Sequence, residues 1–378
     1  MNIEMVDLKN QYLKLKNEID LSISNVINST KFINGPDVDL FTNSLKKYLN
    51  VKHVIPCANG TDALQISFMA LNLKKGDEVI CPAFTYVATL EILVLLGLKP
   101  VLVDVDYKSF NISIDHIKNK ITKKTKAIIP VHLFGQSCDM EPILSFAKKY
   151  NLFVVEDNAQ AFGSNFKFKN GEVKMTGTIG DIGTTSFFPS KNLGCYGDGG
   201  AIFTNNTKLY KRIKMICNHG QSKKYYHDIL GVNSRLDSIQ ASILNVKLKY
   251  IDDFNNSRIK MAETYNSHFK EISDYIKVPY TFSFSKHIYH QYSILINSNL
   301  RDSLKNFLYK NNIPSMIYYP LPLYNQKAFN KLFDSNFELK NTENICKRIL
   351  SLPIHTEIET SNQNKIIQKV LEFFNNKL

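Results

Sequence analysis

The sequence predicts an α/β protein with a mostly parallel central sheet flanked by helices, followed by a smaller C-terminal α+β domain. From residue 53 onward, short apolar segments of strand length alternate with amphipathic segments of helix length, the pattern of βαβ units. The 378 residues are 44% hydrophobic and 21% charged, which is ordinary for a folded protein and excludes disordered, collagen-like and fibrous chains. The longest near-continuous apolar run, residues 92–98, is too short to cross a bilayer, which takes about 20 residues.

The first fifty residues are predicted to be helical, because apolar side chains recur there at helical spacing. These side chains are Leu8, Tyr12, Leu15, Ile19 and Ile23, followed by Leu40, Leu45 and Leu49.

The next segment is predicted to supply the strands and helices of the sheet. The predicted strands are 79–81, 100–104, 127–131 and 152–156, and the helices between them are about 88–96, 115–120 and 140–149. Residues 177–204 look like strands interrupted by glycines.

A long helix from about 237 to 270, broken near Asp252-Asp253, is predicted to connect the two parts of the chain. The remainder mixes strand and helix patterns, at 291–296, 302–310, 341–349 and 361–375. We therefore expect one domain over residues 1–250, made of the N-terminal helices and the large α/β unit. A small α+β domain is expected over residues 251–378.

The net charge of +13 favours anionic partners such as nucleic acid, a membrane surface or phosphorylated metabolites. The densest basic run, residues 118–126, has no interleaved aromatic side chains, so no nucleic-acid platform is predicted. The sequence contains neither a GxxxxGK[ST] phosphate loop nor a GxGxxG after the first strand. An ATPase and a standard dinucleotide-binding oxidoreductase therefore lack their motifs.

Six cysteines are scattered without a CxxC pair, which favours buried free thiols over disulfides or a metal site. The N-terminus shows no basic segment followed by an apolar one, so no secretory signal is predicted and the chain is expected to be cytoplasmic.

Two of four candidate site segments follow predicted strands directly. Gly60-Thr61 opens a helical run, where free backbone N–H groups and a hydroxyl can bind an anion, although the same residues also suit a turn and a helix cap. Residues 153–156 look buried and place Asp157 at the carboxyl edge of a strand, where parallel sheets bind ligands. Such a carboxylate can pair with a protonated heterocyclic nitrogen, or simply cap the next helix.

The other two segments add a lysine and a polar loop. Lys191 lies between Ser186 and a glycine-rich turn, and uncharged neighbours of this kind depress the pKa of a lysine and make it a nucleophile for Schiff-base formation. Asn233 and Arg235 precede the long helix and can present polar groups to an anionic ligand, although alone they read as a loop.

Together these segments resemble the DegT/DnrJ/EryC1/StrS family of pyridoxal-phosphate-dependent sugar aminotransferases, from about residue 5 to the C-terminus. The matching residues are Gly60-Thr61, Asp157 with Gln160, Ser186 with Lys191, and Asn233, Arg235, Asp237 and Gln240. The resemblance implies the aspartate aminotransferase type of fold (fold type I) and a homodimer. It also implies transfer of an amino group from L-glutamate to a nucleotide-linked keto sugar, for bacterial surface-glycan or amino-sugar biosynthesis.

The resemblance also implies roles for the residues around the cofactor. Lys191 forms the internal aldimine with pyridoxal 5′-phosphate in a ping-pong mechanism, and Asp157 pairs with the pyridine nitrogen. Gln160 contacts the ring hydroxyl, and Tyr86 stacks on the ring.

Further roles concern the phosphate and the sugar. The resemblance implies that Gly60, Thr61 and Ser186 hold the cofactor phosphate together with Asn233 of the other subunit. It places Arg235, Tyr318 and Tyr319 on the sugar, and no metal ion is implied.

Within the family, residues 187–200 are most similar to the members that aminate C3. Those members include the UDP-2-acetamido-3-keto-hexuluronate and the dTDP-3-keto-6-deoxyhexose aminotransferases. A C4-aminating enzyme stays an alternative, although the Thr-Gly-Glu-Gly-Gly type of turn typical of such members is absent. Tyr318 and Tyr324 stand where relatives have histidine, and both are expected near the sugar, so nucleotide and ring carbon stay open.

Two interpretations from other classes are kept for comparison. The first is a regulatory protein with this fold and no catalysis, which the joint presence of Lys191, Asp157 and Gln160 argues against. The second is a nucleic-acid-binding protein, which only the net charge suggests.

Overall fold

The computed structural model describes residues 3–334 and 336–375. Its helices are α1 (Leu8–Ser29), α2 (Pro36–Leu49), α3 (Gly60–Leu71), α4 (Ala88–Leu95), α5 (Ile114–Lys120), α6 (Met140–Tyr150), α7 (Thr207–Cys217), α8 (Ser238–Leu248), α9 (Ile251–His268), α10 (Ser298–Lys310), α11 (Lys340–Arg348) and α12 (Thr360–Asn375). Its strands are β1 (His53–Cys57), β2 (Glu78–Pro82), β3 (Lys99–Val103), β4 (Thr125–Ile128), β5 (Phe153–Asp157), β6 (Asn165–Lys167), β7 (Val173–Met175), β8 (Ile182–Ser186), β9 (Gly200–Thr204), β10 (Gln221–Lys223), β11 (Tyr226–His227), β12 (Ile276–Lys277), β13 (Tyr292–Ile296) and β14 (Ile349–Leu352).

A seven-stranded sheet with the order β1-β9-β8-β5-β4-β2-β3 forms the centre of the molecule. Strands β8, β5, β4, β2 and β3 run parallel to one another, and β9 pairs antiparallel with both β8 and β1. The carboxyl ends of β5 and β8 therefore lie side by side. This arrangement confirms the predicted mostly parallel sheet.

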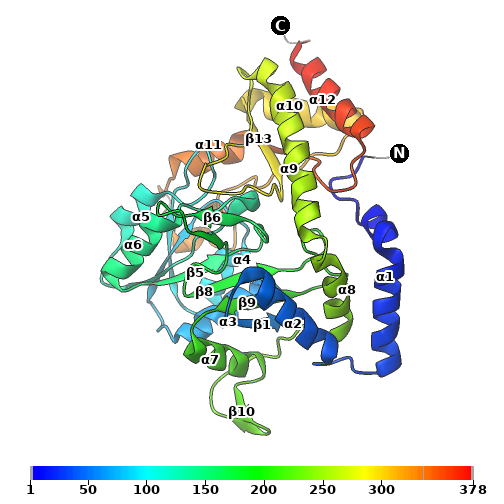
Figure 1. Ribbon diagram of the computed structural model, residues 1–378. Helices are drawn as coiled ribbons and strands as arrows, with labels where there is room; N and C mark the ends of the chain where they lie inside the picture. Colours follow the sequence, from blue (N-terminus) through cyan, green and yellow to red (C-terminus); the bar gives the residue numbers. More distant parts are fainter. Residues whose placement is uncertain (1–2, 335, 376–378) are drawn as a thin grey trace.

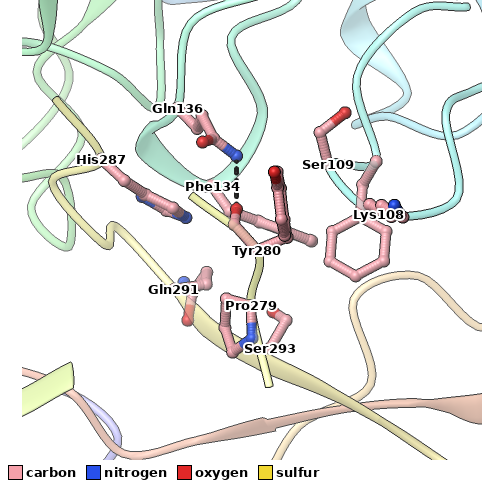
Figure 2. A pocket seen from close by; sticks show the side chains of 10 residues that line it. Lys108, Ser109, Phe134, Gln136, Pro279, Tyr280, His287, Gln291 and Ser293 are labelled. Carbon is pink, nitrogen blue, oxygen red and sulfur yellow. Dashed lines mark hydrogen bonds between the residues drawn. The ribbon is translucent and has the colours of Figure 1, made fainter. Parts of the chain in front are cut away.

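The C-terminal part has its own antiparallel sheet, β12-β13-β14, with α9, α10 and α12 around it (Figure 1). Residues 279–293 of this part run along loops of the large sheet, where Gln136 Nε2 donates to the carbonyl oxygen of Tyr280 at 2.9 Å (Figure 2). A hollow of about 10 Å³ remains at this junction, room for about one water molecule.

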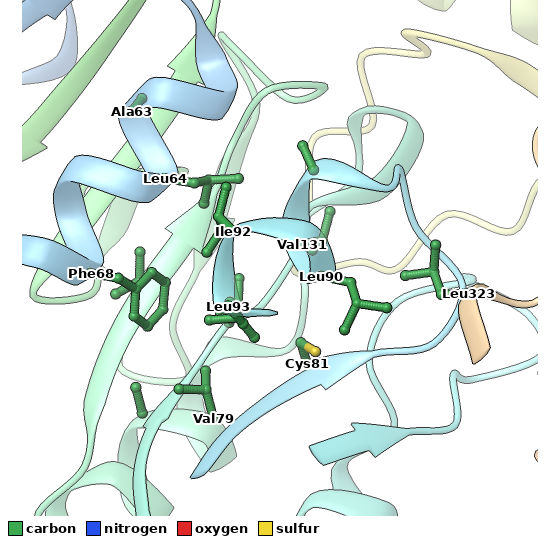
Figure 3. Packing of buried hydrophobic residues seen from close by; sticks show 14 of the residues in the cluster. Ala63, Leu64, Phe68, Val79, Cys81, Leu90, Ile92, Leu93, Val131 and Leu323 are labelled. Carbon is green, nitrogen blue, oxygen red and sulfur yellow. The ribbon is translucent and has the colours of Figure 1, made fainter. Parts of the chain in front are cut away.

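The main hydrophobic core lies between the large sheet and the helices α3 and α4. Figure 3 shows Leu64 and Phe68 of α3 and Leu93 of α4 near Val79 and Cys81 of β2. Burying each of the larger side chains stabilises the fold by roughly 1.5–3 kcal/mol. This packing fixes the position of α3 on the sheet, next to β2.

All six cysteines are buried and free, which confirms that prediction. Burial raises the pKa of each of these thiols, so they are unreactive.

The long helix breaks at Lys249 and Tyr250, close to the predicted position, which confirms the predicted interruption, and Asp252 and Asp253 occupy the first turn of α9. Acidic side chains there interact favourably with the helix dipole, so the pair marks a helix start. Phe153, predicted to be buried, is 37% exposed because it begins β5 at the surface.

Candidate active site

One cavity of about 630 Å³ lies at the carboxyl ends of β5 and β8 and brings together most of the predicted site residues. Nine of the eleven line it, namely Gly60, Thr61, Tyr86, Asp157, Gln160, Ser186, Lys191, Tyr318 and Tyr319. They come from segments more than 250 residues apart in sequence, from Gly60 to Tyr319.

The first turn of α3 forms one wall of this cavity. Asn59 caps the helix, with its Oδ1 accepting from the backbone N–H of Asp62 at 2.7 Å, and the helix begins at Gly60. A Cβ on Gly60 would lie 2.7 Å from the Cβ of Ser186, so only glycine lets the helix start approach β8 this closely. The backbone N–H groups of a first turn lack intrahelical partners, so this wall is suited to an anion.

Ser186 completes this wall from the end of β8. Its Oγ accepts from the backbone N–H of Phe188 at 3.2 Å, which leaves the hydroxyl proton available to a ligand. Gly60-Thr61 therefore lies at a capped helix start, as one interpretation of the sequence predicted. The same helix start can also bind an anion, as the other interpretation predicted.

Asp157 lies at the end of β5, 6% exposed, with its carboxylate held from two sides. Oδ1 accepts from the backbone N–H of Ala159 at 3.1 Å, and Oδ2 accepts from the hydroxyl of Thr89 at 2.9 Å. Each oxygen keeps a further lone pair for a donor in the cavity. Sequence reasoning missed Thr89, whose only signal was its place three residues after Tyr86.

Lys191 follows β8 on a turn in which its backbone N–H donates to the carbonyl oxygen of Phe188 at 2.8 Å. Burial lowers the pKa of Lys191 from 10.5 to about 8, while the charge of Asp157 opposes this shift. A large fraction of the lysine is therefore a neutral, nucleophilic amine near pH 8, as its uncharged neighbours predicted.

Helix α8 holds the glycine-rich turn that follows Lys191. Gln240 accepts from the backbone N–H of Tyr196 at 2.8 Å and donates to its carbonyl oxygen at 3.3 Å. The buried ammonium of Lys247 donates to the carbonyl oxygen of Gly194 at 2.8 Å and lies 4.5 Å from the ring centre of Tyr196. Gln240 was part of the recognised pattern, whereas nothing in the sequence indicated Lys247.

Gln160 and Tyr319 both line the cavity and form a hydrogen-bonded pair. Gln160 Oε1 accepts from the backbone N–H of Phe134 at 3.0 Å, and Nε2 donates to the Tyr319 hydroxyl at 3.0 Å. Burial raises the pKa of Tyr319, so its hydroxyl stays protonated and can donate. The ring of Tyr86 is 56% exposed and 6.3 Å from that of Tyr319, which leaves its face free.

The two tyrosines predicted near the sugar differ in position. Tyr318 lines the cavity, but Tyr324 does not, so the expectation for Tyr324 is wrong. Tyr324 is 3% exposed, its hydroxyl donates to Glu343 at 3.0 Å, and it accepts from the backbone N–H of Leu339 at 3.1 Å. Packing against the segment before α11 keeps it away from the cavity.

Asn233 and Arg235 do not line the cavity of their own chain. Asn233 is exposed, and Arg235 pairs with the carboxylate of Asp237. Between them, Ser234 Oγ accepts from the backbone N–H of Ala58 at 3.0 Å, which docks this loop behind the start of α3.

Sequence reasoning also missed several polar residues that line the cavity, among them Thr85, Ser190, Asp198, His290 and Gln291. The last two come from the segment before β13, and no local pattern connects that segment to the site. The described residues contain no group of three or more metal-ligating side chains. In the same part of the chain, no helix has both the length and the hydrophobicity of a membrane span.

Three comparisons with known proteins cover nearly the whole chain. It is 43% identical over 375 residues to a pleiotropic regulatory protein of Geobacillus stearothermophilus, covering 99% of both chains. It is 41% identical over 360 residues to UDP-2-acetamido-2-deoxy-3-oxo-D-glucuronate aminotransferase of Pseudomonas aeruginosa, covering 95% of this chain and 97% of that one. The structure of Bacillus subtilis NtdA with bound cofactor PMP is 31% identical, with a TM-score of 0.88 over 95% of this chain and 82% of the other.

Structural similarity at this level confirms the predicted aminotransferase fold of type I, and the Pseudomonas relative confirms the resemblance to members that act on a C3 ketone. One family model matches residues 13–371, which is nearly the whole chain. This chain is therefore an aminotransferase that belongs to the DegT/DnrJ/EryC1/StrS aminotransferase family.

Proposed function

We propose that this chain uses pyridoxal 5′-phosphate to transfer the amino group of L-glutamate to the C3 keto group of a nucleotide-linked sugar. The observation that carries the proposal is that Lys191, Asp157 and the start of α3 line one cavity. The name of the Pseudomonas relative supports both the nucleotide sugar and the ketone at C3.

The residues of the cavity fit this cofactor. A side chain on Gly60 would close the space between α3 and Ser186, where the phosphate would lie against free N–H groups. Thr85 Oγ1 is buried beside the cavity and finds no hydrogen-bond partner in the described part of the chain, which leaves it for a bound molecule. Lys191 would be the covalent attachment point, and Tyr86 would lie against the ring.

Asp157 and Gln160 would bind the two polar edges of the ring. The carboxylate of Asp157 would keep a proton on the pyridine nitrogen. The amide of Gln160, which Phe134 and Tyr319 fix, would donate to the ring hydroxyl. When bound, the cofactor carries the amino group between two half-reactions and withdraws electrons from the reacting carbon.

Lys191 would move the proton in each half-reaction. With the substrate amine bound, Nζ of Lys191 would take the proton from the substrate carbon and would hold it for the return step. Glutamate gives up its amino group in the first half-reaction and leaves as 2-oxoglutarate. The sugar ketone receives the amino group in the second, with the same steps in reverse.

The proposed site is shared between the two subunits of a homodimer. Asn233 would reach the cofactor phosphate of the partner subunit, and Arg235 would contact the sugar beside Tyr318 and Tyr319. The exposure of Asn233 and its position outside the cavity of its own chain support this arrangement. The six free thiols support a reducing, cytoplasmic location.

A regulatory protein without catalysis is the second candidate, because the Geobacillus relative carries a regulatory name. Catalysis is favoured because the cavity contains Lys191, Asp157 and Gln160 together. A C4-aminating enzyme is the alternative within the same chemistry.

The test is incubation of the purified protein with glutamate and a panel of UDP- and dTDP-linked 3-keto and 4-keto sugars, with products identified by mass spectrometry. We expect a yellow protein, an amino sugar from a 3-keto substrate, and no turnover by Lys191→Ala. Borohydride reduction should fix the cofactor on the peptide that contains Lys191. Attachment to another lysine, or products only from 4-keto sugars, would contradict the assignment.

A further inference from the structure

Lys247 on α8 is a buried charged residue to which the mechanism above gives no role. Its side chain is 1% exposed and has no carboxylate partner in the described part of the chain. Its Nζ donates to the carbonyl oxygen of Gly194 at 2.8 Å and lies 4.5 Å from the ring centre of Tyr196. An ammonium group has three donors, so these contacts only partly replace the water that it loses on burial.

A buried charge of this kind does not stabilise a fold. Replacing buried charged groups with apolar side chains of similar size is often neutral or stabilising. Burial lowers the pKa of Lys247 from 10.5 to about 8, against a smaller effect of the Cys195 thiol in the opposite direction. The stability of the fold therefore does not explain a lysine at this position.

A short series of contacts connects Lys247 with Lys191. Gly194 packs against the other side of its own turn, because a Cβ there would overlap the carbonyl of Pro189 and lie 2.9 Å from the carbonyl oxygen of Phe188. The same carbonyl oxygen of Phe188 accepts the backbone N–H of Lys191 at 2.8 Å. Lys247 therefore holds the turn at a point that touches the backbone around Lys191.

No other group holds the turn at this point. The backbone N–H of Cys195 closes the base of the turn by donating to the carbonyl oxygen of Phe187 at 2.8 Å. Among the described residues, Lys247 is the only donor to the carbonyl oxygen of Gly194. Without the ammonium group, this segment would keep its base but lose its contact with α8 at Gly194.

We infer that Lys247 is a positioning residue for Lys191, and that its ammonium group keeps the turn closed so that the reactive amine stays buried in the cavity. The inference rests on the proposed function, because it concerns the lysine that would bind the cofactor. An open turn would admit water to the amine, favour its ammonium form and displace Nζ from the reacting carbon. An apolar side chain in place of Lys247 would thus impair the reaction without weakening the fold.

The charged groups around Lys191 are accounted for. Burial lowers the pKa of Lys191 and the charge of Asp157 raises it, without a contribution from Lys247. Asp198 and His290 line the same cavity, and burial, with the charges of Lys191 and Arg258, lowers the pKa of His290 well below its usual value. Loss of the charge of Lys247 is therefore not by itself expected to change the protonation of Lys191.

On α1, Tyr12 packs edge-on against Tyr196, and its hydroxyl donates to Asp20 at 2.8 Å. The substitutions below leave these groups and the Cys195 thiol unchanged. A difference between the variants therefore reports on the side chain at position 247.

The experiment compares Lys247→Met, which keeps a long side chain and removes the charge, with Lys247→Arg, which keeps a cation that can donate to Gly194. Lys249→Met is the matched control, because Lys249 lies at the end of the same helix, is exposed and pairs with Glu18 at 2.9 Å. Urea unfolding at pH 7 measures the stability of each protein. We expect Lys247→Met to be at least as stable as the wild type, since the carbonyl left without a donor is neutral. A clear loss of stability would overturn the inference, because Lys247 would then be a structural residue.

The main readout is the pH dependence of labelling of Lys191 by trace acetic anhydride in the cofactor-free chain, located by peptide mass spectrometry. We expect a midpoint near pH 8 in the wild type, since the pKa of Lys191 is about 8. In Lys247→Met, entry of water should raise the midpoint by about one unit, toward that of an exposed lysine. Lys247→Arg and Lys249→Met should keep the wild-type midpoint.

Turnover gives a second readout. Lys247→Met should lower kcat about tenfold with little change in the KM of the sugar, and Lys247→Arg should restore most of it. A wild-type midpoint in folded Lys247→Met, or an equal shift in Lys247→Arg or Lys249→Met, would overturn the inference. Failure of the wild type to bind pyridoxal phosphate would instead overturn the proposed function, because the labelling needs no cofactor.

Discussion

At the scale of single residues, Asp157 shows how a buried carboxylate is kept ready for a ligand. Its donors, Ala159 N–H and the Thr89 hydroxyl, hold the plane of the group while leaving a lone pair on each oxygen. Because these two bonds are made by the chain itself, the carboxylate needs no rearrangement to meet a protonated ring nitrogen. The position of the group is therefore set before the cofactor arrives.

We expect Asp157→Asn to bind pyridoxal phosphate measurably and to lose several orders of magnitude in kcat. An amide cannot stabilise a protonated pyridine nitrogen, so electron withdrawal fails while the phosphate contacts at α3 persist. Cofactor binding is measured by absorbance and turnover by product formation. The control is Asp115→Asn, an acid-to-amide change at the surface start of α5. A variant within a few-fold of the wild-type rate would show that Asp157 is only a structural cap.

At the scale of elements, strand β5 depends on a second carboxylate, that of Glu156, which does not line the cavity. Glu156 is fully buried and accepts hydrogen bonds from His132 Nε2 at 2.9 Å and from the backbone N–H groups of Gly177, Ile179 and Gly180 at 2.6–2.8 Å. One carboxylate thus ties the loop before β8 to β5. Asp157, which ends β5, and Lys191, which follows β8, take their relative position from this connection.

Glu156→Gln should therefore lower the free energy of unfolding by about 3 kcal/mol or more, because an amide nitrogen would face backbone N–H donors in a buried site. Urea unfolding monitored by circular dichroism measures this change. Glu372→Gln, which removes a surface ion pair with Lys369 on α12, serves as the control and should cost less than about 1 kcal/mol. Equal costs for the two variants would mean that the loop is held by other contacts.

The elements also show what a single sequence can predict. The alternation of strands and helices from β2 to β5 was predictable, because the hydrophobic periodicity within each segment indicates its type. The helix break at Tyr250 was also predictable, because the acidic pair that indicated it lies in the first turn of α9. Phe153 was misplaced because an apolar side chain at a strand end carries no signal of its exposure.

For the site, the residues next to strand ends could be predicted, whereas those supplied by tertiary packing could not. Asp157 ends β5 and Lys191 comes shortly after β8, and a recognisable sequence pattern surrounds both. Thr89, His290 and Lys247 reach the site through contacts between distant elements, and their neighbours in sequence look like ordinary helix or strand residues. Tyr324 shows the reverse error, a residue of the expected region that packing turns inward.

At the scale of the whole molecule, the loop around Asn233 would join the two subunits of the proposed homodimer. The loop is anchored through Ser234 to the backbone just before α3, so Asn233 and Arg235 sit on a rigid base. Both lie outside the cavity of their own chain. A second copy would place this anchored loop over the opening of its partner's cavity.

The shared site predicts that two impaired chains can repair one another. Lys191→Ala removes the reactive amine, and Asn233→Ala removes a hydrogen bond to the cofactor phosphate. Loss of one such bond to a charged group costs about 1.5–3 kcal/mol, which corresponds to roughly ten- to a hundredfold weaker cofactor binding.

In a mixed dimer, one site carries both lesions and the other carries neither. When the two variants are mixed under conditions that exchange subunits, activity should rise toward half of the wild-type value per mixed dimer. Mixed dimers, quantified by native mass spectrometry, that show no such recovery would mean that Asn233 acts within its own chain.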